Sequence, residues 1–243
     1  MSLAKPQSDE SIFDVMYQCR AMRRLKPDPV PEELLLQLVD AALQGPSGSN
    51  AQNWTFVIVR DEAMKRQIQI EWKRAWRFYL EFAPKAELRS HEDEASRERM
   101  LKAADYLVEH LHEVPAFVFV ATKKDEPFER ALFSPAAFKA AVRELGWGGT
   151  LKFLASSGST TAMAAGSTSY PAVQNLLLAA RALGLGAVLT TQHFFLPGVF
   201  ESLINLPKSA ALAGIIPVGF PKGKFGPLTR PPAESVVAWD RCP

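Results

Sequence analysis

Cysteine is scarce in this chain, which has only Cys19 and Cys242 among its 243 residues. The two thiols lie near opposite ends, and neither belongs to a cluster that could bind zinc or an iron–sulfur centre. A secreted scaffold held together by several disulfide bridges is therefore excluded. Two isolated thiols favour a reducing compartment over a structural disulfide, so we expect a cytoplasmic protein.

Long apolar runs and a strong charge bias are also missing. No stretch reaches the ~18 apolar residues of a membrane span, and residues 1–6 lack the apolar core of a secretion signal. The net charge of +2 gives no basic footprint for nucleic acid. We therefore expect neither a membrane nor a nucleic acid among the partners.

Several catalytic motifs are absent as well. The chain has no Gly-x-Ser-x-Gly elbow of a hydrolase. His110 and His112 are two residues apart, so on a helix they point to different faces and make no metal site. His91 lies in a charge run, and His193 follows a predicted strand, where we expect a surface position. The sequence therefore identifies no catalytic side chain and no metal ligand.

The chain does have enough apolar residues, 47%, for one substantial core. We interpret residues 1–243 as a single domain with a helical insertion at about 62–112. Hydrophobic periodicity predicts helices over 9–22, 31–44, 62–112 (broken near Pro84) and 171–183, and strands over 54–60, 116–122, 185–191 and 210–219. The small polar residues of 155–169 predict either a mobile loop near a site or a long connector.

The order of these elements indicates the fold class. Gly184 and Gly186 follow a predicted helix and enter a strand, whereas a dinucleotide-binding fingerprint requires a strand that enters a helix. A Rossmann domain is therefore disfavoured, and we predict an α+β fold with a mainly antiparallel sheet covered by helices. The aromatic residues of 72–82 favour helix packing. A wall or lid over a substrate pocket, or a dimer contact, stays open.

Two segments carry the chemistry. Arg20, Arg23 and Arg24 form a compact cationic group, and guanidinium pairs bind phosphate well. If the first helix extends that far, Arg20 and Arg23 share one of its faces. Residues 45–54 form a short loop rich in Gly, Ser, Asn and Gln between a helix and a strand. Such a loop can hold a flat polar ring against the backbone.

Read in order, these motifs resemble the flavin-dependent nitroreductase family. The likeness runs through Arg20-Ala21-Met22-Arg23-Arg24, then Lys26-Pro27-Asp28-Pro29-Val30-Pro31, then Pro46-Ser47-Gly48-Ser49-Asn50-Ala51-Gln52-Asn53-Trp54. It continues with Gln174-Asn175-Leu176-Leu177-Leu178-Ala179-Ala180, Leu183-Gly184-Leu185-Gly186 and Arg230. It covers about residues 11–61 and 170–241. Ala21 stands where the family often has Ser, and Asn53 stands where it often has Pro.

The resemblance implies which residues bind FMN. The arginine segment and Arg230 would hold the phosphate, the loop would lie along the flavin, and the strand end at 190–192 would contact the ring. The expected cofactor-binding residues are Arg20, Ala21, Arg23, Arg24, Pro46, Ser47, Gly48, Asn50, Gln52, Thr190, Thr191, Gln192 and Arg230.

The resemblance also implies an activity. It predicts an FMN-dependent oxidoreductase in which NADH or NADPH and then an electron-poor acceptor, such as a nitroaromatic or a quinone, react in turn by a ping-pong mechanism. It further implies a homodimer with FMN at the subunit interface. Two alternatives stay open: a specialised relative, such as a reductive dehalogenase or a flavin-consuming enzyme, and a flavin-binding storage or sensor protein without efficient turnover.

Overall fold

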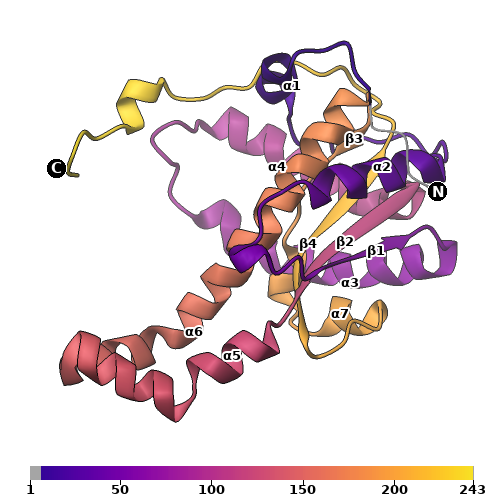
Figure 1. The fold of residues 1–243 in the computed structure, drawn as a ribbon. Coiled ribbons are helices and arrows are strands. Elements are labelled where there is room, and N and C mark those ends of the chain that lie inside the picture. The colour runs from indigo at the N-terminus through magenta and orange to yellow at the C-terminus, as the bar shows by residue number, and fades with distance from the viewer. Residues whose placement is uncertain (1–6, 243) are drawn as a thin grey trace.

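A four-stranded antiparallel sheet forms the centre of the computed structural model, which describes residues 7–242. Its strands lie in the order β1 (Trp54–Val59), β2 (Ala116–Lys123), β4 (Ala210–Gly219) and β3 (Gly186–Ala187), and every neighbouring pair is antiparallel. The predicted α+β class is confirmed. Figure 1 shows the sheet surrounded by helices, with α5 and the first part of α6 extending away from it.

Alternate residues of β2 point to opposite faces of the sheet, and each face has its own core. Val118 and Val120 pack against α2 (Glu32–Leu43) and α6 (Pro135–Ala182). Phe117 and Phe119 pack against α3 (Glu62–Leu80), α4 (Glu94–Glu109) and α7 (Val199–Leu203). Because both faces are covered, β2 is buried from Ala116 to Thr122.

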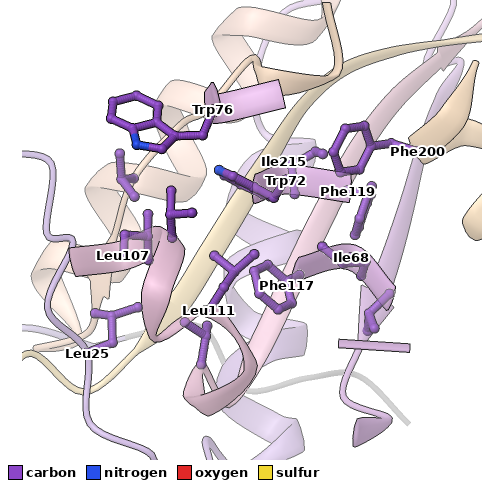
Figure 2. Close-up of a cluster of buried hydrophobic side chains, with 14 of the residues drawn as sticks. Leu25, Ile68, Trp72, Trp76, Leu107, Leu111, Phe117, Phe119, Phe200 and Ile215 are labelled. Atoms are coloured by element: carbon purple, nitrogen blue, oxygen red, sulfur yellow. The ribbon is translucent and has the colours of Figure 1, made fainter. Parts of the chain in front are cut away.

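The predicted aromatic segment divides into buried and exposed rings. Trp72 is fully buried, with its ring centroid 6.3 Å from that of Phe117 and 6.1 Å from that of Phe200. Figure 2 shows Trp72 between these two phenyl rings. Phe78 and Phe82 are 54% and 46% exposed. Helix packing therefore explains the tryptophans, while the outer phenylalanines remain available at the surface.

Helix boundaries follow from local signals. Asp61 and Asp93 cap α3 and α4 with side-chain oxygens that accept from the Met64 and Ser96 amides. The predicted break near Pro84 is confirmed by the short helical turn η2 (Ala83–Lys85), which lies between α3 and α4. The turns η3 (Leu111–Glu113) and η4 (Gln192–Phe195) connect further elements, and α5 spans Glu126–Leu132.

The first predicted helix is shorter than expected. Ser11 caps α1 (Ile12–Gln18), and at Cys19 the backbone leaves the helical region, with φ −72° and ψ 87°. Arg20 and Arg23 therefore follow the helix and share no helical face, which corrects the sequence-based expectation. The reason is tertiary pairing: the Met22 amide donates to the Ala187 carbonyl at 3.0 Å, so this segment lies along the sheet edge.

The prediction of a loop or connector over 155–169 is wrong, because these residues lie inside α6. The helix also runs through Pro171 instead of beginning there, and its one non-helical residue is Gly146. Within the helix, Ser169 Oγ donates to the Ala165 carbonyl at 3.0 Å. Ser169 also bonds the Thr122 hydroxyl of β2, so tertiary contacts outweigh the weak helix propensity of serine and threonine.

The predicted strand over 185–191 is present only in part. β3 covers Gly186 and Ala187, and pairing with β4 resumes as a single bridge between Thr190 and Ile215. Between the two, the side chain of Leu189 lies over Gly214, where a Cβ would clash with Leu189 Cδ1. No helix in the described part of the chain is long and apolar enough to cross a bilayer.

Candidate functional site

Three arginines from two distant segments line one pocket of about 410 Å³. Arg20 and Arg23 come from the segment after α1, and Arg230 comes from the C-terminal segment. We call this cavity the arginine pocket. Its other described lining residues come from α1 and its C-terminal flank, α6, the β3 region and residue 228: Met16, Cys19, Ala21, Gln174, Leu177, Ala187, Val188, Leu189 and Leu228.

Buried apolar residues hold the arginine segment in place. Met22 and Leu25 are buried, and Leu25 forms an isolated antiparallel bridge with Pro221. Gly186 permits this close approach, because a Cβ there would lie 2.7 Å from Leu25 Cδ2 and 3.0 Å from Met22 Cβ. With Met22 and Leu25 anchored, Arg23 between them lines the pocket.

The pocket favours an anion. Its described lining contains no aspartate or glutamate, and within residues 7–242 neither Arg20 nor Arg23 makes a side-chain hydrogen bond or an ion pair. Burial lowers the pKa of Arg23, partly offset by the nearby Tyr79. A guanidinium still keeps its charge at neutral pH. Arg230 donates to the Thr229 carbonyl at 2.8 Å but, like the other two, has no carboxylate partner among the described residues. Three cations without a counter-charge in one cavity match the charge that a phosphate requires.

Arg24 lies elsewhere, although the sequence placed it with its neighbours. Its guanidinium carbon is 5.0 Å from the ring centroid of Tyr106, a cation–π contact. Lys222 reaches the same tyrosine, donating to its hydroxyl at 2.8 Å. Arg24 therefore contacts Tyr106 at the surface and does not line the arginine pocket.

The second predicted segment, residues 45–54, lies against α6 and apart from the arginine pocket. Its short turn η1 (Gly48–Asn50) is held by the Gly48 amide, which donates to Thr168 Oγ1 at 3.1 Å. Ser49, Asn50 and Gln52 have positive φ angles of 51°, 53° and 49°. Such backbone is uncommon for residues other than glycine, and it concentrates at ligand-binding positions.

Hydrogen bonds within the loop fix the positions of its polar groups. Ser47 Oγ accepts from the Gln52 amide at 3.1 Å, and Gln52 Nε2 donates to Asn50 Oδ1 at 3.1 Å. Asn50 and Gln52 are exposed, as is Pro46. None of the predicted loop residues lines the arginine pocket, so one chain does not bring the two halves of the expected site together.

The predicted strand end at 190–192 adjoins the pocket without lining it. Thr190 Oγ1 donates to the Ile215 carbonyl at 2.7 Å, so its hydroxyl is used in the sheet. Thr191 is half-buried and precedes η4. Oε1 of Gln192 is buried and has no hydrogen-bond partner among the described residues. That oxygen is an open acceptor three residues beyond Leu189 and four beyond Val188, both of which line the pocket.

Sequence reasoning missed Gln174 and Cys19 as pocket residues. Gln174 and Leu177 are three apart on α6 and share a face, a signal available in the sequence. The Cys19 thiol donates to the Leu177 carbonyl at an S···O distance of 3.6 Å. Burial raises the pKa of Cys19, so the thiol remains neutral beside the arginines. It acts there as a small packing group.

The expected surface position of His193 is wrong. The residue is 2% exposed, and its Nε2 donates to the Leu212 carbonyl at 2.9 Å. Burial lowers the pKa of His193 to about 4. The imidazole is neutral at physiological pH and is held by β4, which removes it from the candidates for proton transfer at an open surface. No group of three or more potential metal ligands occurs within residues 7–242.

A second cavity, of about 250 Å³, lies where α5 meets the first part of α6. Its described lining is almost wholly apolar and includes Leu132, Phe133, Phe138 and Leu145. Its described polar side chains are the hydroxyls of Ser134 and Thr150, and it has no arginine or lysine to offset the charge of a phosphate-bearing ligand. We therefore place the candidate site at the arginine pocket.

Comparison with known proteins decides the family. The model of the nitroreductase family matches residues 17–220, from the arginine segment to the end of the sheet. This chain belongs to the nitroreductase family. It is 32% identical over 221 residues to an NADH dehydrogenase of Thermus thermophilus, covering 90% of this chain and 91% of that protein.

Other proteins similar to this chain have different names. An iodotyrosine deiodinase of Thermotoga neapolitana is 28% identical over 210 residues, which are 86% of this chain and 88% of that protein. A solved iodotyrosine deiodinase with bound FMN and 3-iodo-L-tyrosine has a TM-score of 0.64 at 24% identity, over 96% of this chain and all of that one. The structural likeness supports the fold, and family membership alone leaves the reaction open.

Proposed function

We propose that this protein is an FMN-dependent oxidoreductase that uses NADH or NADPH to reduce an electron-poor small molecule, such as a nitroaromatic or a quinone. The observation that carries this proposal is the arginine pocket. Arg20, Arg23 and Arg230 line a cavity whose described walls hold no carboxylate. Membership of the nitroreductase family and the NADH dehydrogenase relative support the same reaction class.

The chain's own residues fit FMN. The three guanidinium groups would bind the phosphate with charge-assisted hydrogen bonds. Ala21 lines the same pocket and has no hydroxyl, so the arginines would supply the side-chain contacts. Amide groups such as those of Asn50 and Gln52 can both donate and accept, which suits the alternating edge of an isoalloxazine ring. Bound FMN would supply the hydride-transfer chemistry between donor and acceptor.

We further propose that two copies of the chain complete the site. The loop at 46–52 does not line the arginine pocket of its own chain, so a second copy would present its loop to the flavin ring. Exposed apolar side chains are available for such an interface: Phe13 and Tyr17 of α1 are 68% and 71% exposed. Apolar groups that cluster at one surface mark interaction sites.

The decisive experiment is an absorption spectrum of the purified protein, followed by thermal unfolding with and without added FMN. A ligand bound only by the folded state raises the unfolding temperature. We expect a flavin spectrum, or a clear upward shift with FMN. Bleaching of that spectrum by NADH or NADPH under nitrogen would then distinguish an enzyme from a storage or sensor protein. A colourless protein that FMN does not stabilise would refute the proposal.

A second candidate reaction is reductive dehalogenation. The observation that favours it is the 28% identity with an iodotyrosine deiodinase, which extends over 86% of this chain. The test is anaerobic: reduced, FMN-loaded protein is mixed with 3-iodo-L-tyrosine, and released iodide is measured. Iodide release in preference to reduction of a nitroaromatic would establish this reaction.

A further inference from the structure

Arg181 is buried near the end of α6, where it forms a two-pronged ion pair. Its guanidinium donates to both carboxylate oxygens of Glu10, at 2.8 and 2.7 Å, and to Oε1 of Gln18 at 2.8 Å. The residue is only 6% exposed. Because both partners of a guanidinium–carboxylate fork are planar, this arrangement has one orientation. Arg181 thus holds both ends of α1 against α6.

The same guanidinium contacts the C-terminal segment. Its Cζ lies 4.2 Å from the ring centroid of Phe225, a cation–π contact. The next residue, Gly226, lies beside Arg20: a Cβ there would be 3.7 Å from Arg20 Nη1. The Leu228 amide then donates to the Tyr17 carbonyl at 3.2 Å. The C-terminal segment therefore runs along the end of α1.

These contacts surround the arginine pocket. Gln18 ends α1 two residues before Arg20, and Phe225 precedes Arg230 by five. On α6, Arg181 is four residues beyond Leu177, which lines the pocket, so the two share a helical face. One buried side chain therefore joins three of the segments that form the pocket, although it does not line the pocket itself.

We propose that Arg181 is a positioning residue for phosphate binding. By binding Glu10 and Gln18 and by contacting the ring of Phe225, it fixes the Arg20 segment and the Arg230 segment relative to each other. The arginines then face one anion without rearrangement. This inference rests on the proposed binding of FMN. It assigns to Arg181 no contact with the cofactor.

The test compares FMN with riboflavin, which lacks only the phosphate. In the Arg181→Gln variant we expect the Kd of FMN to rise about tenfold or more, the size of losing one good charged contact, while the Kd of riboflavin changes less than about twofold. A merely structural role would weaken both ligands equally or neither. The ratio of the two constants, measured by flavin fluorescence, is the readout.

Milder variants keep the test decisive if Arg181→Gln fails to fold. Gln18→Ala and Phe225→Leu each remove one contact of the guanidinium, and each should lower the FMN preference by a smaller factor. Arg97→Gln is the matched control: Arg97 is a part-buried arginine paired with Glu92 at 3.1 Å, and it does not line the pocket. Arg97→Gln should lower the unfolding temperature and leave the ratio of the FMN and riboflavin Kd values unchanged.

The outcomes distinguish the proposed function from the positioning role of Arg181. If the parent protein binds neither flavin, the proposed function fails and the inference falls with it. If the parent binds FMN more tightly than riboflavin and the variants that fold keep the parent ratio, the inference is overturned and the proposed function stands. A selective loss of FMN affinity in those variants, absent from Arg97→Gln, supports the positioning role.

Discussion

The indole Nε1 of Trp54 donates a 2.9 Å hydrogen bond to the carbonyl oxygen of Thr168. The hydroxyl of the same threonine accepts from the Gly48 amide at 3.1 Å. One buried residue of α6 therefore bonds both the loop, at Gly48, and the first residue of β1, Trp54, which follows the loop.

The first prediction concerns this attachment. Thr168→Val keeps the shape of the side chain and removes the acceptor for the Gly48 amide. We expect it to reduce the free energy of unfolding by about 0.5–1.5 kcal/mol, the net value of a typical hydrogen bond. Thr168→Ser keeps the hydroxyl and is the control. Denaturant titration measures both, and a Thr168→Val variant as stable as the parent would show that the hydroxyl contributes nothing to stability.

Gly45 provides the second prediction. A Cβ at this position would lie 3.0–3.1 Å from backbone atoms of Pro171 and Ala172, which cannot move independently of α6. Gly45→Ala should therefore destabilise the fold by roughly 1–3 kcal/mol, as overpacking typically does. Gly158→Ala is the control, because a Cβ there meets nothing within 4 Å and alanine favours the helix. Similar thermal unfolding of the two variants would contradict the proposed clash.

The third prediction tests the arginine pocket. Arg20→Ala, Arg23→Ala and Arg230→Ala should each weaken FMN binding by about 1.5–3 kcal/mol, or roughly ten- to a hundredfold in Kd. Arg24→Ala removes the same charge from the same segment, but Arg24 lies over Tyr106, so it should bind FMN like the parent. Fluorescence titration distinguishes them. Equal effects at all four positions would indicate a general charge effect.

The sequence predicted much of this fold because the relevant signals are local. A continuous apolar run specifies β2, and Pro31 with the leucines that follow it specifies α2, which begins at Glu32. The arginine segment resembles the family in the order of its residues, and Arg20 and Arg23 of that segment line one pocket together with Arg230. Short-range patterns of this kind are independent of distant parts of the chain.

The errors arose where distant contacts decide. Residues 155–169 have weak helix signals, yet α6 continues through them because Thr168 and Ser169 bond the loop and β2. His193 is buried because Leu212, nineteen residues away, accepts its hydrogen bond. Arg24 does not line the arginine pocket, because its guanidinium lies over the ring of Tyr106 on α4. None of these pairings has a signature in the local sequence.

The fourth prediction is a dimer. Light scattering of the protein at micromolar concentration should give twice the chain mass of 26.8 kDa. Phe13→Asp and Tyr17→Asp would place charges in the exposed apolar face of α1, so they should shift the equilibrium toward monomer and weaken FMN binding in parallel. A monomeric parent with FMN bound would contradict a site shared between two copies.

The last prediction follows from the buried imidazole of His193. Its pKa is lowered from an ordinary value of 6.5 to about 4 because burial disfavours the charged form. Between these two values the unfolded chain binds more protons than the folded one. Stability contributed by this residue is therefore complete above pH 6.5 and is lost as the pH falls toward 4, by about 3 kcal/mol at most. His193→Gln has no titrating ring and should lose this part of the pH dependence, whereas His91→Gln, at an exposed position, should keep it.

The His193→Gln variant also tests whether His193 takes part in the chemistry. If the imidazole takes no part in proton transfer, turnover at neutral pH stays within about tenfold of the parent, less than the ~10²-fold loss expected for a general acid–base group. Denaturant titration from pH 4 to 7, with turnover measured at pH 7, checks both statements. A larger loss of turnover with FMN still bound would make His193 a catalytic residue.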